Sequence, residues 1–101
     1  MWLFAMFDLP VETKEQRRDY AQFRKLLLKQ GFVQLQLSVY ARYSASEESV
    51  EAARMRIRAS LPPRGQVRLI AVTDHQYGRM EVWFGKKSKP VEDPPVQFEL
   101  F

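Results

Sequence analysis

Residues 1–10, MWLFAMFDLP, form a nearly unbroken apolar run that ends in one carboxylate, Asp8, with Pro10 two residues later. A run of this length is too short to cross a bilayer, which takes about 20 apolar residues, and it lacks the features of a secretory signal. It is typical of a buried β-strand. Because Leu9-Pro10 forces the backbone to turn away, we expect Asp8 to lie at the rim of a sheet.

The composition is that of one small domain. The chain has 101 residues, of which 46% are hydrophobic and 13% aromatic, enough for a single packed core. It has no cysteine, which excludes disulfides and thiolate metal sites, and its one histidine, His75, leaves few options for an imidazole metal site. Since we find no targeting or membrane segment, we expect a cytoplasmic protein without a membrane partner.

The excess positive charge is confined to one segment. The chain has 16 basic and 12 acidic residues, giving a net charge of +4. The segment Lys14–Gln30 carries all of this excess, because its only acidic residues are Glu15 and Asp19. Its basic residues are Lys14, Arg17, Arg18, Arg24, Lys25 and Lys29. Such a concentration of cations favours an anionic partner.

The same segment has the signature of an amphipathic helix. Thr13 followed by Gln16 is a capping-box pattern, so we expect a helix from Lys14 that ends at Gly31. One face, expected to pack on the core, carries Gln16, Tyr20, Phe23, Leu26 and Leu27, and the opposite face is a basic ridge of Lys14, Arg18, Lys25 and Lys29 flanked by Arg17 and Arg24. A second helix is predicted from Glu47 to about Ser60, ended by Pro62-Pro63.

Alternating apolar residues predict the other strands. We expect a long strand over 32–43, a third over 66–73 and a fourth over 79–84, the last two separated by a polar turn over 74–78. Residues 85–95 form a charged, proline-rich linker, and residues 96–101, VQFELF, form a final strand suited to pairing with another chain. The element order is βαβαββ if the long strand is continuous, and βαββαβ if it bends into a hairpin.

Three segments together resemble one family. They are FDLPVETKEQRR (7–18), FRKLLLKQGFVQLQLSVYAR (23–42) and IAVTDHQYGRMEVWFGK (70–86). Their order and spacing are similar to CRISPR-associated protein family two, the small subunit of the spacer-acquisition complex, in its type II branch. We find no P-loop, dinucleotide-binding glycine pattern, zinc spacing or catalytic triad that would favour another class.

The resemblance implies both a fold and a role. The implied fold is an α+β, ferredoxin-like βαββαβ sandwich over residues 1–85, with a linker and C-terminal strand over 86–101, and a homodimer formed through facing sheets. The implied role is a scaffold that grips double-stranded DNA by its phosphates and bridges two dimers of the CRISPR integrase. A ligand-binding regulatory module on the same frame is a further alternative, but the chain lacks a glycine-rich ligand turn.

Asp8 has two interpretations. The resemblance makes it a ligand for Mg²⁺ or Mn²⁺ and a catalytic residue of a metal-dependent endonuclease acting on RNA or DNA, in which the twofold axis brings Asp8 of both protomers together. The alternative is a turn residue whose carboxylate bonds backbone amides ahead of Pro10. A lone carboxylate supplies neither a general base nor a leaving-group acid, so enzymatic activity stays an open question at this point. Ser38 could add a hydroxyl near Asp8, or could simply fill a small interface position.

The first turns of the helix beginning at Lys14 are the predicted DNA contact. Lys14, Arg17 and Arg18 lie where cations oppose the helix dipole, a cost that a phosphate backbone would offset. The resemblance implies DNA contacts at this end of the helix and near Arg79, whereas the simpler interpretation is a solvated surface for all four. We expect His75 to be a surface turn residue. The aromatic residues Tyr40, Tyr43, Trp83 and Phe84 could stack on bases, but they are more typical of a core or an interface.

Overall fold

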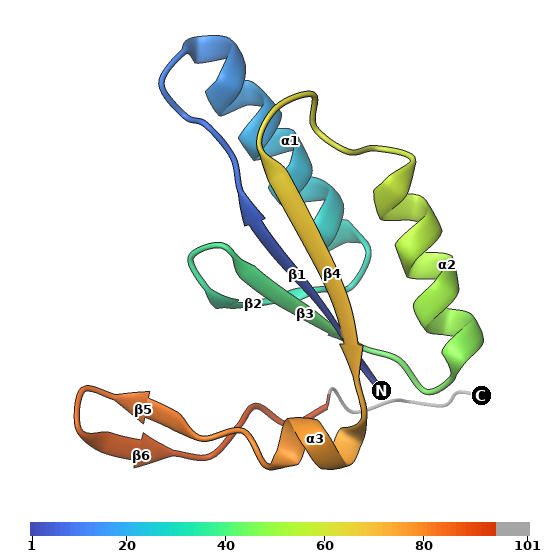
Figure 1. Ribbon diagram of the computed structural model, residues 1–101, viewed down its shortest axis with the longest axis vertical. Helices are drawn as coiled ribbons and strands as arrows, with labels where there is room; N and C mark the ends of the chain where they lie inside the picture. Colours follow the sequence, from blue (N-terminus) through green and yellow to red (C-terminus); the bar gives the residue numbers. More distant parts are fainter. Residues whose placement is uncertain (95–101) are drawn as a thin grey trace.

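In the computed structural model, which describes residues 1–94, the apolar run at the start of the chain is strand β1 (Trp2–Asp8) (Figure 1). β1 lies inside a four-stranded antiparallel sheet, between β3 (Val39–Tyr43) and β4 (Gln66–Val72), and β2 (Val33–Gln36) pairs with β3 at one edge. The order across the sheet is β2-β3-β1-β4. The predicted α+β class is therefore confirmed.

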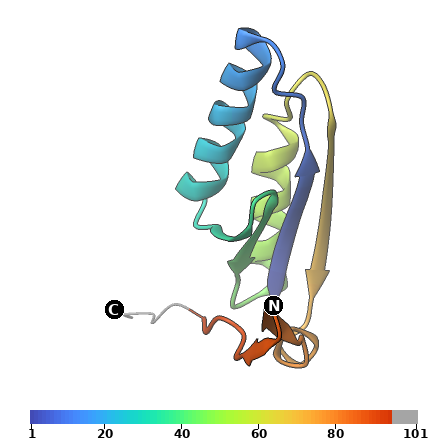
Figure 2. The same cartoon turned by 90° about the vertical axis from the view of Figure 1, so that its left-hand side faces the viewer.

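Two helices cover one face of this sheet and leave the other face open (Figure 2). Helix α1 (Lys14–Lys29) begins with the predicted capping box, in which Gln16 N donates to Thr13 Oγ1 and Thr13 N donates to Gln16 Oε1. Gly31 follows α1 with a φ of 90°, a backbone conformation that glycine adopts without strain. Helix α2 (Glu47–Arg58) begins at the N-cap Ser46. Of the helices in the described residues, none combines the length and apolar character needed to span a bilayer.

Alternation along β1 builds two apolar layers, one on each face of the sheet. Leu3, Ala5 and Phe7 point toward the helices, where they pack with Phe23 and Leu27 of α1. This main core is completed by Leu9, Phe32, Tyr40, Val50, Ala53 and Ile57. On the open face, Trp2 packs with Ala41 and Tyr77 in a smaller cluster near the start of β1.

The long strand expected over 32–43 is instead a hairpin. β2 and β3 are joined by a tight turn at Leu37-Ser38, with a shift in register between Gln34 and Gln36. Leu37, at the tip, is 77% exposed, because the turn removes it from the face that its alternation with Leu35 and Val39 suggests. No glycine, proline or asparagine marks this turn, which is why the sequence pattern continues through it. The order βαβαββ is therefore wrong, and residues 2–72 follow the order β1-α1-β2-β3-α2-β4.

The expectations for residues 74–89 also need correction. The predicted polar turn is a short helix, α3 (Asp74–Gly78), because Thr73 and Gln76 form a second capping box. The predicted fourth strand does not join the main sheet. Its end is β5 (Val82–Phe84), which pairs with β6 (Lys87–Lys89) in a separate hairpin (Figure 1). The start of the predicted linker thus forms part of a hairpin, and the final strand expected over 96–101 lies outside the described residues.

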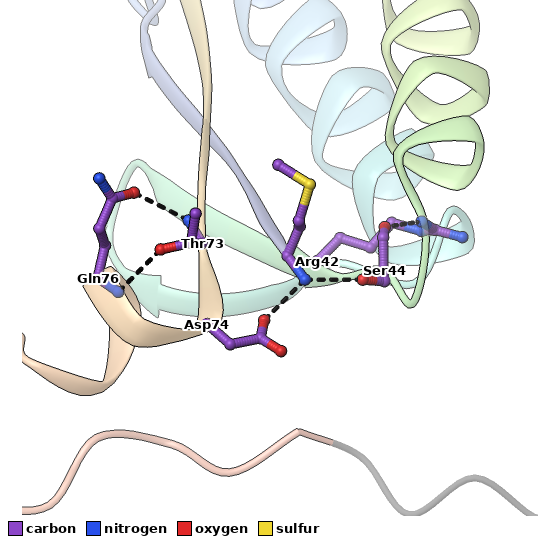
Figure 3. Close-up of polar contacts among 6 residues, drawn as sticks. Arg42, Ser44, Thr73, Asp74 and Gln76 are labelled. Atoms are coloured by element: carbon purple, nitrogen blue, oxygen red, sulfur yellow. Dashed lines mark hydrogen bonds and ion pairs between the residues drawn. The ribbon is translucent and has the colours of Figure 1, made fainter.

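Polar contacts gather where β3 ends and α3 begins, and Figure 3 shows those of Arg42, Ser44, Thr73, Asp74 and Gln76. The α-amino group of Met1 donates to the Ser44 carbonyl oxygen (2.9 Å) and lies 2.7 Å from Asp74 Oδ1, which attaches α3 beside the start of β1. Arg42 donates through Nε to the Gln30 carbonyl oxygen (2.7 Å) and through a terminal nitrogen to the Ser44 hydroxyl. Burial lowers the pKa of Arg42 from its ordinary value, and the nearby charge of Arg56 lowers it further.

Candidate functional site

Asp8 lies at the far end of β1 on the open face of the sheet. It is the last residue of the strand, opposite Gln66 of β4, and its side chain is exposed. Within residues 1–94 its carboxylate takes part in no hydrogen bond or ion pair with protein. The backbone bonds expected of a turn-forming aspartate are therefore not observed. The carboxylate is directed to solvent, where a cation or a polar partner can reach it.

A shallow groove runs beside Asp8. Its volume is about 250 Å³, and it is lined by Met6, Phe7, Asp8, Ser38, Val39, Gln66 and Arg68. The Ser38 carbonyl oxygen accepts a hydrogen bond from Phe7 N (3.1 Å), which holds the β2–β3 turn against the end of β1. The structure thus brings Ser38 to the same groove as Asp8, as the sequence suggested. Arg68 donates from Nε to Gln66 Oε1 (2.9 Å), so one cationic side chain shares this groove with the carboxylate.

One copy of the chain supplies only part of the ligand set that a divalent cation needs. No group of three or more histidine or acidic side chains in the described residues lies close enough to hold a metal ion. Mg²⁺ accepts one or two carboxylates together with several waters, so a single exposed Asp8 offers one suitable ligand. A second carboxylate would have to come from another molecule. The donor chemistry therefore allows Mg²⁺ or Mn²⁺ at Asp8 without building a complete metal site.

The predicted DNA-binding residues Lys14, Arg17 and Arg18 lie together in the first turns of α1, and all three are exposed. None of them takes part in an ion pair within residues 1–94. Arg17 is the most constrained, because one terminal nitrogen donates to the carbonyl oxygens of Val11 (3.1 Å) and Glu12 (2.8 Å). Arg17 thus stabilises the loop that leads into α1, while Lys14 and Arg18 remain available to an anion.

The acidic residues of α1 are paired with a cation from a different part of the chain. Arg64 lies in the loop between α2 and β4. Its two terminal nitrogens each lie 3.7 Å from a carboxylate oxygen, one of Glu15 and one of Asp19. Spacing along the sequence gives no sign of this contact, since Arg64 is 45 or more residues away from both partners. Arg68 was also missed, although its outward position in the alternation of β4 could have indicated it.

Arg79 lies far from the other candidate residues. It is exposed at the C-terminal end of α3, where its backbone N–H donates to the carbonyl oxygens of His75 and Gln76. Asp8 and the start of α1 lie at one end of β1, and α3 lies at the other (Figure 1). His75 is exposed, as expected, but in a helix and not in a turn. The structure thus separates Arg79 from the cations of α1.

The four aromatic candidates divide into two groups. Tyr40 is fully buried in the main core and presents no ring face for a base, whereas Tyr43 is half-buried with its ring edge-to-face against Trp2. Trp83 and Phe84 of β5 are 56% and 61% exposed, and the Lys89 ammonium lies 4.5 Å from the centre of the Phe84 ring. Trp83 also lines a groove with Phe4, Met6 and Leu35 on the open face of the sheet.

Comparison with known proteins identifies relatives across the whole chain. A family model described as CRISPR associated protein Cas2 matches residues 1–80. The chain is 48% identical over 101 residues to the CRISPR-associated endoribonuclease Cas2 of Parvibaculum lavamentivorans, covering all of both proteins. It is 44% identical to the protein of the same name from Flavobacterium psychrophilum, covering 100% of this chain and 88% of that protein.

A solved structure shares the fold. The crystal structure of Streptococcus pyogenes Cas2 at pH 6.5 superposes with a TM-score of 0.63 at 19% identity, covering 83% of this chain and 100% of that one. The matched fold, the family model and full-length identities well above 30% agree with the resemblance of the three sequence segments. The chain belongs to the Cas2 family of CRISPR-associated proteins.

Proposed function

We propose that this protein is a dimeric scaffold subunit of the CRISPR spacer-acquisition complex, which binds double-stranded DNA and bridges integrase dimers in the cytoplasm. Family membership supports a role in CRISPR immunity. The strand order β2-β3-β1-β4, with both helices on one face, supports the ferredoxin-like topology of the proposal. The observation that carries the DNA-binding role is the pair of exposed cations, Lys14 and Arg18, for which the described residues offer no carboxylate partner.

The open face of the sheet is the proposed dimer interface. Ile70 of β4 is 50% exposed and Val33 of β2 is 47% exposed on this face. Apolar side chains on an uncovered sheet face gain stability when a second sheet packs on them, since sheets pack face to face at about 10 Å. A twofold axis would pair each patch with its own copy. Sedimentation equilibrium of Ile70→Asp, compared with the exposed control Leu61→Asp, tests this arrangement through loss of the dimer in the first variant alone.

Duplex binding is tested with two matched variants of α1. Lys14→Ala/Arg18→Ala removes two charges from the proposed contact, and Lys25→Ala/Lys29→Ala removes two from the other end of the helix. Because each neutralised phosphate releases condensed counterions, the first variant should lose affinity for a mixed-sequence duplex on the order of tenfold and reduce the salt slope by about 0.9 for each lost contact. Equal losses in both variants would show that only bulk charge matters and would refute this contact.

The partner is tested by co-purification. The full-length chain and the integrase encoded with it, expressed together, should elute as one complex whose mass includes two copies of this chain. Duplex DNA should then be protected over a length that spans both integrase dimers. Separate elution of the two proteins at physiological salt would argue against the bridging role.

A metal-dependent endonuclease is the second candidate function. Two observations favour it: the relatives at 48% and 44% identity are named endoribonucleases, and Asp8 is exposed with its carboxylate unbonded in the described part of the chain. Asp8 of both protomers would hold Mg²⁺ or Mn²⁺, and such an ion would supply an activated water. Arg68 would place a cation in the same groove, where a phosphate of the substrate could lie.

The nuclease proposal is tested with an isosteric variant. Asp8→Asn keeps the shape of the side chain and removes its charge. RNA and DNA cleavage by the wild-type protein should require Mg²⁺ or Mn²⁺, stop in the presence of a chelator and be absent from Asp8→Asn, while duplex binding persists. Cleavage that survives both chelator and Asp8→Asn would indicate a contaminant and would end this proposal.

A further inference from the structure

The guanidinium of Arg64 pairs with both acidic residues of helix α1. In the described residues, Glu15 and Asp19 are the only carboxylates of α1, and both lie 3.7 Å from terminal nitrogens of Arg64. Glu15 and Asp19 are four residues apart, so their side chains lie on the same side of the helix, one turn from each other. Glu15 follows Lys14 directly in the chain, and Asp19 follows Arg18 directly. Adjacent helix positions point about 100° apart, but Glu15 lies three residues before Arg18 and therefore on the same side of the helix as that proposed DNA-binding cation.

The backbone at Arg64 is restrained by the residues on both sides of it. Pro62 and Pro63, which restrict the backbone before it, line a pocket together with Asp19 of α1. Gly65, which follows it, has a φ of 87° and packs so closely on β1 that an added Cβ would lie 2.5 Å from the Asp8 carbonyl oxygen. The loop is thus held at both sides of Arg64. Its side chain is 49% exposed, and its guanidinium lies beside the Glu15 and Asp19 carboxylates of α1.

We infer that Arg64 is a positioning residue for duplex binding, which masks Glu15 and Asp19 so that an incoming phosphate meets Lys14 and Arg18 without carboxylate repulsion. A single surface ion pair of this length contributes little to stability. Its effect on an incoming polyanion is different, because loss of the guanidinium both removes a positive charge and exposes two negative charges. The inference rests on the proposed duplex-binding function and names a residue that the resemblance does not.

The test is a charge-neutralisation cycle with a fluorescent mixed-sequence DNA duplex. Arg64→Gln removes one unit charge and should weaken binding about fourfold, the size expected for one unit charge acting across about 5 Å of water. Arg58→Gln makes the same charge change on the exposed surface of α2 and should weaken binding less than twofold. Arg58 takes part in no ion pair within the described residues, which makes it a suitable control.

The decisive comparison measures the effect of Glu15→Gln/Asp19→Asn on duplex affinity twice, once with Arg64 present and once in Arg64→Gln. Glu15→Gln/Asp19→Asn should restore the affinity of Arg64→Gln to within twofold of the wild type, yet change the affinity by less than twofold when Arg64 is present. Additive effects in the two backgrounds would overturn the masking role. Failure of the double variant to restore binding would also overturn it, because Arg64 would then contact phosphate directly.

Folding and the underlying function are controlled separately. If Arg64→Gln does not fold by circular dichroism, Arg64→Lys replaces it, since lysine keeps the charge but can meet only one carboxylate at a time. The same non-additivity is then expected at smaller size, and its absence would overturn the inference. If Lys14→Ala/Arg18→Ala leaves duplex binding unchanged, the proposed function fails first. If Lys14→Ala/Arg18→Ala does lose duplex binding but the effects of the Arg64 and carboxylate variants are additive, only the masking role of Arg64 is refuted.

Discussion

The indole of Trp2 lies stacked on the phenol of Tyr77, with ring centres 3.9 Å apart and planes inclined by 8°. Tyr77 belongs to α3 and Trp2 begins β1, so this contact fixes the short helix on the open face of the sheet. The Tyr77 hydroxyl also donates to Glu92 Oε1 at 3.2 Å, which holds the chain beyond the β5–β6 hairpin against α3. The position of Arg79, at the end of α3, follows from the same contacts.

Truncating Tyr77 should therefore be costly. Tyr77→Ala removes a buried ring from the Trp2 stack, and we expect the free energy of unfolding to fall by about 3–5 kcal/mol. Tyr77→Phe keeps the stack and loses only the bond to Glu92, at a cost of about 1 kcal/mol. Urea denaturation monitored by tryptophan fluorescence measures both. Equal losses in the two variants would contradict the stacking contribution.

Tyr77 should also make stability depend on pH in the alkaline range. Burial, together with the negative charge of Glu92, raises the pKa of Tyr77 to about 12 from an ordinary value of 10.0. Between these values the folded protein binds more protons than the unfolded chain, so the free energy of unfolding falls as the pH rises from about 10 to about 12. Below pH 10 the contribution is fully present. Tyr77→Phe should remove one late-ionising tyrosine from the titration of phenolate absorbance.

Tyr40 offers a stabilising substitution. It is fully buried, and its hydroxyl has no hydrogen-bond partner within residues 1–94. A buried hydroxyl without a partner carries a desolvation cost, so Tyr40→Phe should raise the free energy of unfolding by about 1 kcal/mol. Tyr43→Phe, at a half-buried position, is the control and should change it by less. A destabilised Tyr40→Phe would show that the hydroxyl has a favourable partner after all.

Gly65 should tolerate no side chain. Its φ is 87°, and an added Cβ would lie 2.5 Å from the Asp8 carbonyl oxygen and 2.9 Å from Leu9 Cα. Gly65→Ala combines backbone strain with this overlap, so we expect a loss of about 2–5 kcal/mol and a displaced Asp8. Gly78→Ala is the matched control, because nothing lies within 4 Å of its Cβ position and its φ is not positive. Thermal unfolding of the two variants should differ clearly, and similar melting curves would contradict the close approach.

Local signals were enough to predict the helices and the central strand. Thr13 with Gln16 and Ser46 mark helix starts through bonds between near neighbours, so the sequence indicates them directly. The predicted core face of α1 is confirmed by burial of Phe23 and Leu27. The end of β1 at Asp8 follows from Leu9-Pro10. These features depend on contacts within a few residues.

The two errors in the secondary structure have different causes. The turn at Leu37-Ser38 is stabilised by pairing with β1, including the bond from Phe7 N to the Ser38 carbonyl oxygen, and not by its own residues. Helix α3 does have a local signal, the Thr73–Gln76 capping box with the same spacing as Thr13–Gln16, which the prediction of a polar turn did not take into account. Contacts with Trp2 and Met1, more than 70 residues away along the chain, hold this helix in place. For the candidate site, Asp8 and the cations of α1 could be named in advance. Arg64 and Arg68 could not, because their neighbours are set by the sheet and the loop after α2.

The pairing of β1 with β4 also limits how the chain can fold during synthesis. Trp2 pairs with Val72 and Asp8 pairs with Gln66, so β1 gains its second neighbour only after β4 has been translated. Until then one edge of β1 has no partner, and such an edge is a site for mispairing. Rapid translation through residues 66–72, or a chaperone that shelters nascent β1, should therefore raise the yield of native protein.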